Sequence, residues 1–340
     1  MFLYVTSDNI GSQTGGGIVT KHELNALQSL GEVIVINPEP KADPFETENE
    51  VFKKIKSINL EQIKLVHFYS ATYPSFVKFL KSKNIKVTYT VAAHDKEESK
   101  KEFELNGMSY DFPHMVNPDL FEKYISSYKN SDIVICPSKN SQNYNKKIGC
   151  GNTVIIPHGC YEMRSKNLPK TFNVGYLGQI GPDKGIIYLL KAWEKLNYHD
   201  SILNIAGSQS TLLLNYIRTL KGGNYNIMGY VKNIEDFFDR CTIYVQPSVT
   251  EGFGIEVLEA MSMGRPVIVS DGAGACDVVE NCGLVFPARN VDYLADAINK
   301  FKTEKKFLEE ASGKCVSTSE KYRWEKIQKM YVEIWSKLLC

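Results

Sequence analysis

Short runs of β-branched and apolar residues alternate along almost the whole chain with stretches long enough for amphipathic helices. Most of these runs lack a period-two alternation, which is typical of strands covered on both faces. The spacing is that of βαβ units, which build open parallel sheets with helices on either side, so the predicted fold class is α/β. The predicted strands are Phe2–Ser7, Val33–Asn37, Leu65–Tyr69, Lys86–Val91, Ile133–Pro137 and Thr153–Ile156 in the first half, and Asn173–Leu177, Ser201–Ala206, Tyr225–Ile227, Ile243–Gln246, Pro266–Val269 and Gly283–Phe286 in the second.

The 340 residues are enough for two domains of about 150 residues each. A polar, proline-containing stretch, Cys160–Thr171, separates two predicted strands and marks the joint. We therefore predict an N-terminal Rossmann-like domain over residues 1–165 and a C-terminal one over 166–318. Two such domains facing each other form a cleft at the carboxyl ends of their strands, where α/β sheets bind ligands.

The last segment, residues 319–340, is predicted to be helical. Its apolar side chains Ile327, Tyr331, Ile334 and Leu338 recur at helical spacing and form one stripe. We expect this helix to cross back and dock on the N-terminal domain. A helix lying on a membrane surface is the alternative. The mixture of Glu and Lys on the opposite face argues against that alternative.

Charge and composition narrow the classes of function. The 40 Lys and Arg residues nearly balance the 39 Asp and Glu, so the basic surplus of a nucleic-acid binder is absent. The N-terminal sequence MFLYVTSDN is typical of a strand and not of a signal peptide, and no window approaches the ~18 apolar residues of a spanning helix. The eight cysteines show no CxxC pair, which favours reduced thiols. A cytoplasmic protein is expected, with peripheral membrane contact and oligomeric state left open.

Two glycine-rich turns follow predicted strands. The first contains Gly15, Gly16 and Gly17 and leads into a predicted helix, Ile18–Leu30. Glycines at such a turn let a phosphate approach backbone N–H groups at a helix N-terminus, although a tight turn without a ligand has the same pattern. The second turn contains Lys184, which is either a point charge for a diphosphate or a solvated lysine.

The most informative segment runs from Glu251 to Glu259, directly after a predicted strand. If it were helical throughout, the two carboxylates would be about 12 Å apart, too far to flank one bond or share one metal ion. That separation suits the two ends of a nucleotide diphosphate sugar, between which Gly252 and Gly254 permit close backbone approach. Glu259 would then accept both ribose hydroxyls, as an acidic residue does in dinucleotide folds. Two solvated glutamates on a helix are the alternative.

The segment EGFGIEVLE, with EAMSMGRPVIVSD and GLVFP after it, resembles the retaining glycosyltransferases of family 4, which have the GT-B fold. GYLGQIGPDKGIIYLLKAW is similar to the donor loop of that family, and SDIVICPSKN and VIIPHG are similar to its inner segments. The resemblance is most specific over residues 173–287.

The resemblance implies a role for each matching residue. Lys184 would bind the diphosphate and Glu259 the ribose, while Glu251 and the Phe253–Ile255 backbone would hold the transferred sugar. The turn at Tyr230 and Val231 falls where the family seats the nucleotide base. The implied donor-binding residues are Gly15, Gly16, Gly17, Gln179, Lys184, Tyr230, Val231, Gly252, Phe253, Gly254, Ile255 and Glu259.

His94, in TYTVAAHD, matches the active-site histidine of the family, so the implied catalytic residues are His94 and Glu251. The expected role of His94 is a hydrogen bond to the donor sugar, and a structural histidine is the alternative. The chain departs from the family at Gln179, where an arginine is usual. A neutral amide there removes one of two cations at the diphosphate.

The resemblance predicts transfer of a sugar, with retention, from a UDP- or GDP-linked donor to a hydroxyl of a glycan, a lipid-linked acceptor or a small-molecule glycoside. No metal or cofactor is expected. The acceptor is expected near Gly11–Gly17, His94–Asp95 and Asn106–Asn117, where Tyr110 and Phe112 suit a sugar platform or a packed loop. A nucleotide-sugar binding protein without catalysis, a sugar-phosphate phosphorylase and a nucleotide-sugar epimerase of the same architecture are the alternatives.

Overall fold

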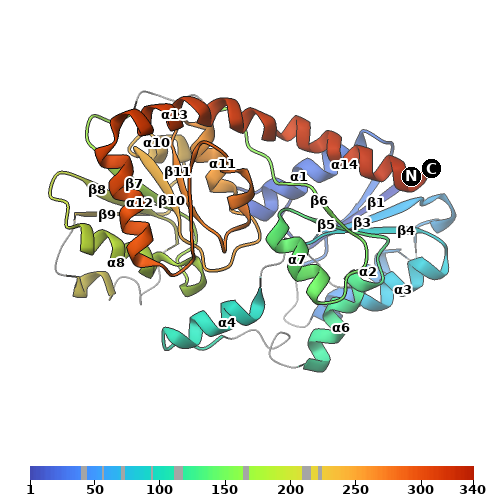
Figure 1. Ribbon diagram of the computed structural model, residues 1–340. Helices are drawn as coiled ribbons and strands as arrows, with labels where there is room; N and C mark the ends of the chain where they lie inside the picture. The colour runs from blue at the N-terminus through green and yellow to red at the C-terminus, as the bar shows by residue number, and fades with distance from the viewer. Residues whose placement is uncertain are drawn as a thin grey trace. The chain divides into compact units, whose positions relative to one another are not determined.

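The computed structural model describes residues 1–39, 44–55, 57–69, 73–92, 95–110, 118–163, 168–208, 216–220 and 224–340. The chain divides into two compact units, each built on a parallel sheet with helices packed against it (Figure 1). The first unit comprises Met1–Ala93, Asp111–His158 and Trp324–Cys340, and the second comprises His94–Tyr110 and Gly159–Arg323. This division differs from the sequence-based boundaries because residues 95–110 belong to the second unit.

The first unit contains a six-stranded parallel sheet in the order β2-β1-β3-β4-β5-β6. The strands are β1 (Phe2–Thr6), β2 (Val33–Ile36), β3 (Leu65–Tyr69), β4 (Lys86–Thr90), β5 (Ile133–Cys136) and β6 (Thr153–Ile155). The helices are α1 (Gly15–Gln28), α2 (Pro44–Ile55), α3 (Pro74–Ser82), α6 (Pro118–Lys129), α7 (Lys139–Lys147) and α14 (Trp324–Leu339), with one 3₁₀ turn, η1 (Leu60–Gln62). The strand order reverses between β1 and β3, and ligands of such sheets bind at this kind of position.

The C-terminal helix docks on the first unit, as predicted, but it is shorter than the sequence indicated. Helix α13 (Lys305–Ser319) and a 3₁₀ turn, η4 (Glu320–Tyr322), precede it, so α14 starts only at Trp324. The indole of Trp324 stacks on the imidazole of His22 in α1, with ring centroids 4.1 Å apart. Trp335, and not Ile334, is buried on the docking face, because the stripe that begins at Trp324 meets position 335 after three turns.

A buried polar cluster ties α14 to the sheet beneath it. The carboxylate of Glu23 on α1 accepts hydrogen bonds from the hydroxyls of Tyr4 and Tyr331, both at 2.8 Å. A ring nitrogen of His67 lies 3.3 Å from the same carboxylate. Burial opposes the charge on Glu23, but His67 and the hydrogen bonds from Thr90 and Tyr4 outweigh it and lower the pKa of Glu23. The Glu23 carboxylate therefore belongs to the internal structure of this unit.

The second unit contains a six-stranded parallel sheet in the order β12-β11-β10-β7-β8-β9. The strands are β7 (Asn173–Leu177), β8 (Ile202–Ala206), β9 (Tyr225–Gly229), β10 (Ile243–Gln246), β11 (Val267–Ser270) and β12 (Gly283–Phe286). The helices are α4 (Lys96–Leu105), α8 (Ile186–Leu196), α10 (Ile234–Phe238), α11 (Ile255–Ser262), α12 (Val291–Thr303) and α13, with 3₁₀ turns η2 (Pro182–Lys184), η3 (Gly274–Val278) and η4. Helices α8 and α12 pack side by side over a core that includes Trp193 and Phe301 (Figure 1).

Counted from β7, this is the doubly wound Rossmann order, and its reversal lies between β7 and β10. The twelve strands of the described residues coincide with the twelve predicted runs to within two residues at either end. The predicted α/β class with two parallel sheets is confirmed. No helix in the described ranges combines the length and the apolar composition needed to cross a membrane.

Candidate functional site

The loops that follow β7 and β10 meet at the point where the strand order of the second unit reverses. Gly185 is left-handed, with φ of 67°, and a Cβ atom there would lie 1.9 Å from the carbonyl oxygen of Pro247. The backbone N–H of Val249 donates to the carbonyl of Asp183 at 2.8 Å. Since only glycine permits this approach, the two loops are joined backbone to backbone, and the next residues of each are brought together.

Lys184 and Glu251 form an ion pair where these loops join. The Lys184 ammonium donates to the Glu251 carboxylate, and both side chains are about one-fifth exposed, at 19% and 20%. Burial opposes the charge on Lys184, but Glu251 and then Asp183 outweigh it and raise its pKa. Burial also raises the pKa of Asp183, although Lys184 works against that shift. Two of the residues singled out by the sequence, Lys184 and Glu251, therefore form a single ion pair.

The segment between Glu251 and the next helix is an extended loop held by backbone bonds. The N–H of Glu251 donates to Gly272 at 3.0 Å, and the N–H of Ala275 donates to Phe253 at 2.8 Å. Gly254, with φ of 98°, ends the loop and precedes α11. The distance of about 12 Å between Glu251 and Glu259 assumed a helix over the whole segment. That assumption is wrong, because only the residues from 255 onward are helical. The N-terminus of α11 therefore lies at the end of this loop.

Glu259 lies within α11 and is buried, with 7% of its surface exposed. Among the described residues, its carboxylate has no hydrogen-bond partner. Burial, and then the nearby Glu256, raise the pKa of Glu259 from 4.5 to about 8. Burial and Glu251 also raise the pKa of Glu256. A buried acid without a partner is costly, and such groups concentrate at functional sites.

A layer of buried polar side chains lies below the loop. The Tyr244 hydroxyl on β10 donates to the carbonyl of Leu177 on β7 at 3.0 Å. The amide of Gln246 donates to the Ser248 hydroxyl at 2.8 Å. The Tyr244–Leu177 bond crosses the strand reversal and ties β10 to β7, whereas the Gln246–Ser248 bond orders the start of the loop that follows β10.

The remaining predicted residues of the second unit lie on neighbouring loops. Gln179 is exposed, and its carbonyl accepts the hydroxyl of Tyr176 at 2.8 Å. Tyr230 follows β9 and is 70% exposed, and Val231 beside it is half-buried. Strand β9 lies two strands from β7, so these loops share the carboxyl edge of the sheet with Lys184.

The predicted glycines of the first unit are part of helix α1 and do not precede it. The helix starts at Gly15 and not at Ile18, because Thr14 caps it by accepting the N–H of Gly17 at 3.1 Å. A Cβ atom at Gly17 would lie 2.7 Å from the backbone oxygen of Asn9. The packing of this turn thus requires glycine at position 17 whether or not a ligand binds.

His94 and Phe112 lie outside the described residues. Tyr110 is half-buried and packs edge-on against Phe103, with ring centroids 5.3 Å apart. This contact favours the packed-loop interpretation for Tyr110.

Helix α4 contributes to this site in a way that the sequence did not reveal. The N–H of Asp95 donates to the Thr250 hydroxyl at 3.0 Å, and the Ser99 hydroxyl donates to the Asp183 carboxylate at 3.2 Å. Its sequence, KEESKKEFEL, is so rich in charge that no apolar pattern in it indicates these contacts. Within the described parts of the chain, His, Cys, Asp and Glu side chains form no group of three that could hold a metal ion.

Comparison with known proteins assigns this region. Residues 171–303 match the family model described as Glycosyl transferases group 1. This segment is therefore similar to the group 1 glycosyltransferases. It contains Lys184, Glu251 and Glu259. The O-antigen chain mannosyltransferase B of Escherichia coli is 28% identical over 159 residues, which cover 44% of this chain and 42% of the relative. The chain thus spans less than half the length of that relative.

Solved structures match over nearly the whole chain. A sucrose-phosphate synthase from Thermosynechococcus elongatus has a TM-score of 0.80 at 18% identity, covering 99% of this chain and 98% of that one. HepE of Anabaena in complex with UDP-glucose has a TM-score of 0.71 at 16% identity, covering 99% of this chain and 100% of that one. These likenesses concern the fold, and the predicted GT-B fold is confirmed.

Proposed function

We propose that this protein is a retaining glycosyltransferase that moves a sugar from a UDP- or GDP-linked donor to a hydroxyl of a glycan, a lipid-linked acceptor or a small-molecule glycoside. The observation that carries the proposal is the buried carboxylate of Glu259. Its raised pKa and its lack of a hydrogen-bond partner among the described residues mean that folding does not use its charge. A ribose diol offers two hydroxyl donors to one carboxylate and would satisfy it.

The diphosphate of the donor would lie beside Lys184 and the N-terminus of α11. The ammonium of Lys184 is held in place by Glu251, and the N-terminus of α11, which has no side-chain cap, favours a negative group. Charge builds on the phosphate oxygens as the sugar leaves, so positioned donors stabilise the transition state more than the ground state. Glu251 and the Phe253–Ile255 backbone would hold the sugar.

In the proposed reaction, the bond between the anomeric carbon and the phosphate oxygen breaks as the acceptor oxygen bonds to that carbon on the same face. The departing phosphate oxygen takes the acceptor proton, so the configuration is retained and no separate base is needed. The leaving charge is assigned to Lys184 and backbone N–H groups, without a metal or cofactor. His94 at the donor sugar, Gly15, Gly16 and Gly17 at the phosphates, and Tyr230 and Val231 at the base remain parts of the proposal.

The class of acceptor is supported by the relative named above, a mannosyltransferase whose name refers to an O-antigen chain. We accordingly favour a glycan acceptor over a small-molecule glycoside. A cytoplasmic location and contact with a membrane surface remain predictions.

A donor screen tests the proposal. UDP, GDP and ADP are titrated into the full chain by thermal shift, since a bound ligand raises the melting temperature by mass action. The sugar forms of the nucleotide that binds are then incubated with glycan acceptors, and product configuration is assigned by NMR. Lys184→Ala should lose at least tenfold in diphosphate affinity, whereas Lys195→Ala, an exposed lysine on α8, should match the parent.

The outcomes separate the alternatives. Binding without transfer to any acceptor would favour a nucleotide-sugar binding protein, and conversion of the sugar without an acceptor would favour an epimerase. A phosphorylase would require inorganic phosphate. A product of inverted configuration, or no binding of any nucleotide, would refute the proposal.

A further inference from the structure

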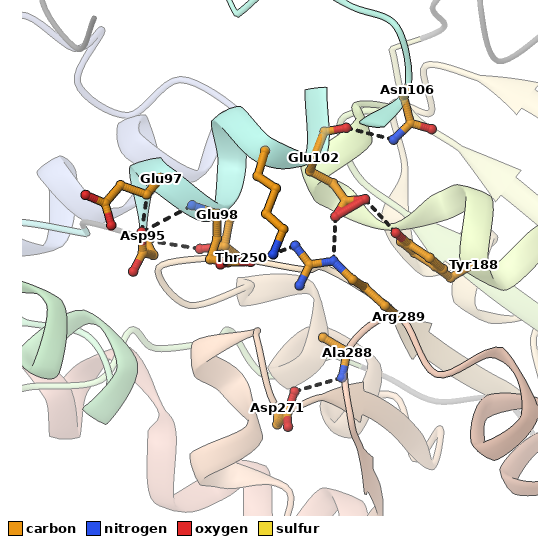
Figure 2. A network of polar contacts seen from close by, with 11 residues as sticks. Asp95, Glu97, Glu98, Glu102, Asn106, Tyr188, Thr250, Asp271, Ala288 and Arg289 are labelled. Atoms are coloured by element: carbon orange, nitrogen blue, oxygen red, sulfur yellow. Dashed lines mark hydrogen bonds and ion pairs between the residues drawn. The ribbon is translucent and has the colours of Figure 1, made fainter. Parts of the chain in front are cut away.

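Within the second unit, helix α4 is anchored by a charged cluster built around the buried side chain of Glu102 (Figure 2). The guanidinium of Arg289 donates to Glu102 and to Glu98, both at 2.7 Å. The Tyr188 hydroxyl on α8 donates to the other carboxylate oxygen of Glu102 at 2.5 Å. Glu102 is fully buried, so each of its oxygens is held by a defined donor. A charge-assisted bond of this kind stabilises a fixed position of the helix.

The turn that carries Arg289 is itself adapted to this contact. Arg289 has a φ of 70°, a conformation that side-chain-bearing residues rarely adopt. The neighbouring N–H of Ala288 donates to Asp271 at 2.8 Å, which supports the turn (Figure 2). Helix α8, through Tyr188, and the turn after β12, through Arg289, thus both hold α4 in place.

The first turn of α4 lies against the loops that carry the candidate site. Asp95 contacts Thr250, which directly precedes Glu251, and Ser99 contacts Asp183, which directly precedes Lys184. Lys96 lies between these two anchor points of the helix and is half-buried. Lys96 therefore lies next to the place where the loops after β7 and β10 meet.

The charged groups that act on Lys96 belong to the candidate functional site. Burial lowers the pKa of Lys96, and Asp183, Lys184 and Glu251 all act on its ammonium. Coulomb interactions of this kind fall off with distance and with exposure to water. Lys96 therefore shares the electrostatic environment of the Lys184–Glu251 pair.

The charge of a donor exceeds what Lys184 alone can neutralise. A nucleotide diphosphate sugar carries about two negative charges, and the free nucleoside diphosphate about three. Lys184 is one cation and is already paired with Glu251, while Gln179 on the same loop is neutral. A second cation beside Lys184 would add to the backbone N–H groups in stabilising the leaving group, and among the described residues Lys96 is a lysine that lies against both site loops.

We propose that Lys96 of α4 is the second cation of the donor site and that it contacts the diphosphate together with Lys184. This inference rests on the proposed function, because it assumes a nucleotide diphosphate at Lys184. It gives α4 a role in donor binding, with the Arg289 cluster as the device that positions it. Lys96 binds the donor and Arg289 is a positioning residue.

The test compares Lys96→Gln with Lys96→Arg and with Lys100→Gln in the full chain. Lys100 lies on the same helix, is 49% exposed and pairs with Glu104, so it controls for the loss of a charge on α4. Whichever of UDP, GDP and ADP binds the parent is titrated by calorimetry, together with its nucleoside monophosphate.

Lys96→Gln should weaken the diphosphate about tenfold and the monophosphate less than about threefold, because the second cation acts mainly on the terminal phosphate. Lys96→Arg and Lys100→Gln should stay within about threefold of the parent. Equal weakening of both nucleotides, or no change, would overturn the role of Lys96. If Lys184→Ala loses affinity while Lys96→Gln does not, only this inference fails; if the parent binds none of the nucleotides, the proposed function fails with it.

Discussion

Replacing Glu259 by Gln tests the ribose contact, and the structure sets the size of the effect. The pKa of Glu259 is raised from 4.5 to about 8 in the ligand-free protein. At pH 7 only about one molecule in ten then carries the charge, and at pH 6 about one in a hundred. The ionised carboxylate is the form that accepts two hydroxyls. Nucleotide affinity should therefore rise roughly fiftyfold between pH 6 and pH 8 and level off above that.

The assay is calorimetric titration of the bound nucleoside diphosphate into parent and Glu259→Gln at half-unit steps from pH 6 to pH 9. The ratio of the two affinities removes the ionisation of the phosphate, because both proteins meet the same ligand. A 2′,3′-dideoxy nucleotide is the matched control and should show no difference in pH profile between the proteins. Parallel profiles with the natural nucleotide would refute the assignment of Glu259 to the ribose.

The same substitution has an opposite effect on stability. For an acid whose folded pKa is raised, the neutral form is favoured in the folded state, so stability falls as pH rises from 4.5 towards 8. At pH 7 the ionisation of Glu259 in the unfolded chain alone lowers the free energy of unfolding by about 3 kcal/mol. Glu259→Gln should therefore melt several degrees higher at pH 7 and match the parent near pH 4.5. A lower melting temperature at pH 7 would show that the carboxylate supports the fold.

Two further substitutions test the internal structure of each unit. Glu23→Ala removes the acceptor of two buried tyrosine hydroxyls and the partner of His67, so the free energy of unfolding should fall by about 3–5 kcal/mol in urea titration; a loss below about 1 kcal/mol would contradict the role of this cluster. Gly185→Ala places a Cβ 1.9 Å from the Pro247 oxygen and should separate the two site loops, lowering nucleotide affinity at least tenfold. The control is Gly313→Ala in α13, where nothing lies within 4 Å, and it should stabilise the protein slightly without changing affinity. Equal affinities for the two alanine variants would contradict the joined-loop geometry.

The order of the strands was predictable because burial on both faces leaves a local pattern. Apolar runs such as Leu65–Tyr69 and Ile243–Gln246 are strands at the predicted bounds, since each is bounded by polar turns. The break before α14 and the first turn of α1 were not predictable in the same way. Both depend on caps and on single contacts, such as Thr14 with Gly17, that have little effect on hydrophobic periodicity.

The sequence by itself determined the α/β class, the strands and the identity of the charged residues in the EGFGIEVLE segment. Only the tertiary structure decided that Lys184 and Glu251 form a pair, that Glu259 is buried without a partner among the described residues, and that α4 belongs to the second unit. The physical reason is that periodicity reports burial along one element. Ion pairs, raised pKa values and contacts such as that of Arg289 with Glu102 depend on elements far apart in the chain. These elements become neighbours only when the chain folds.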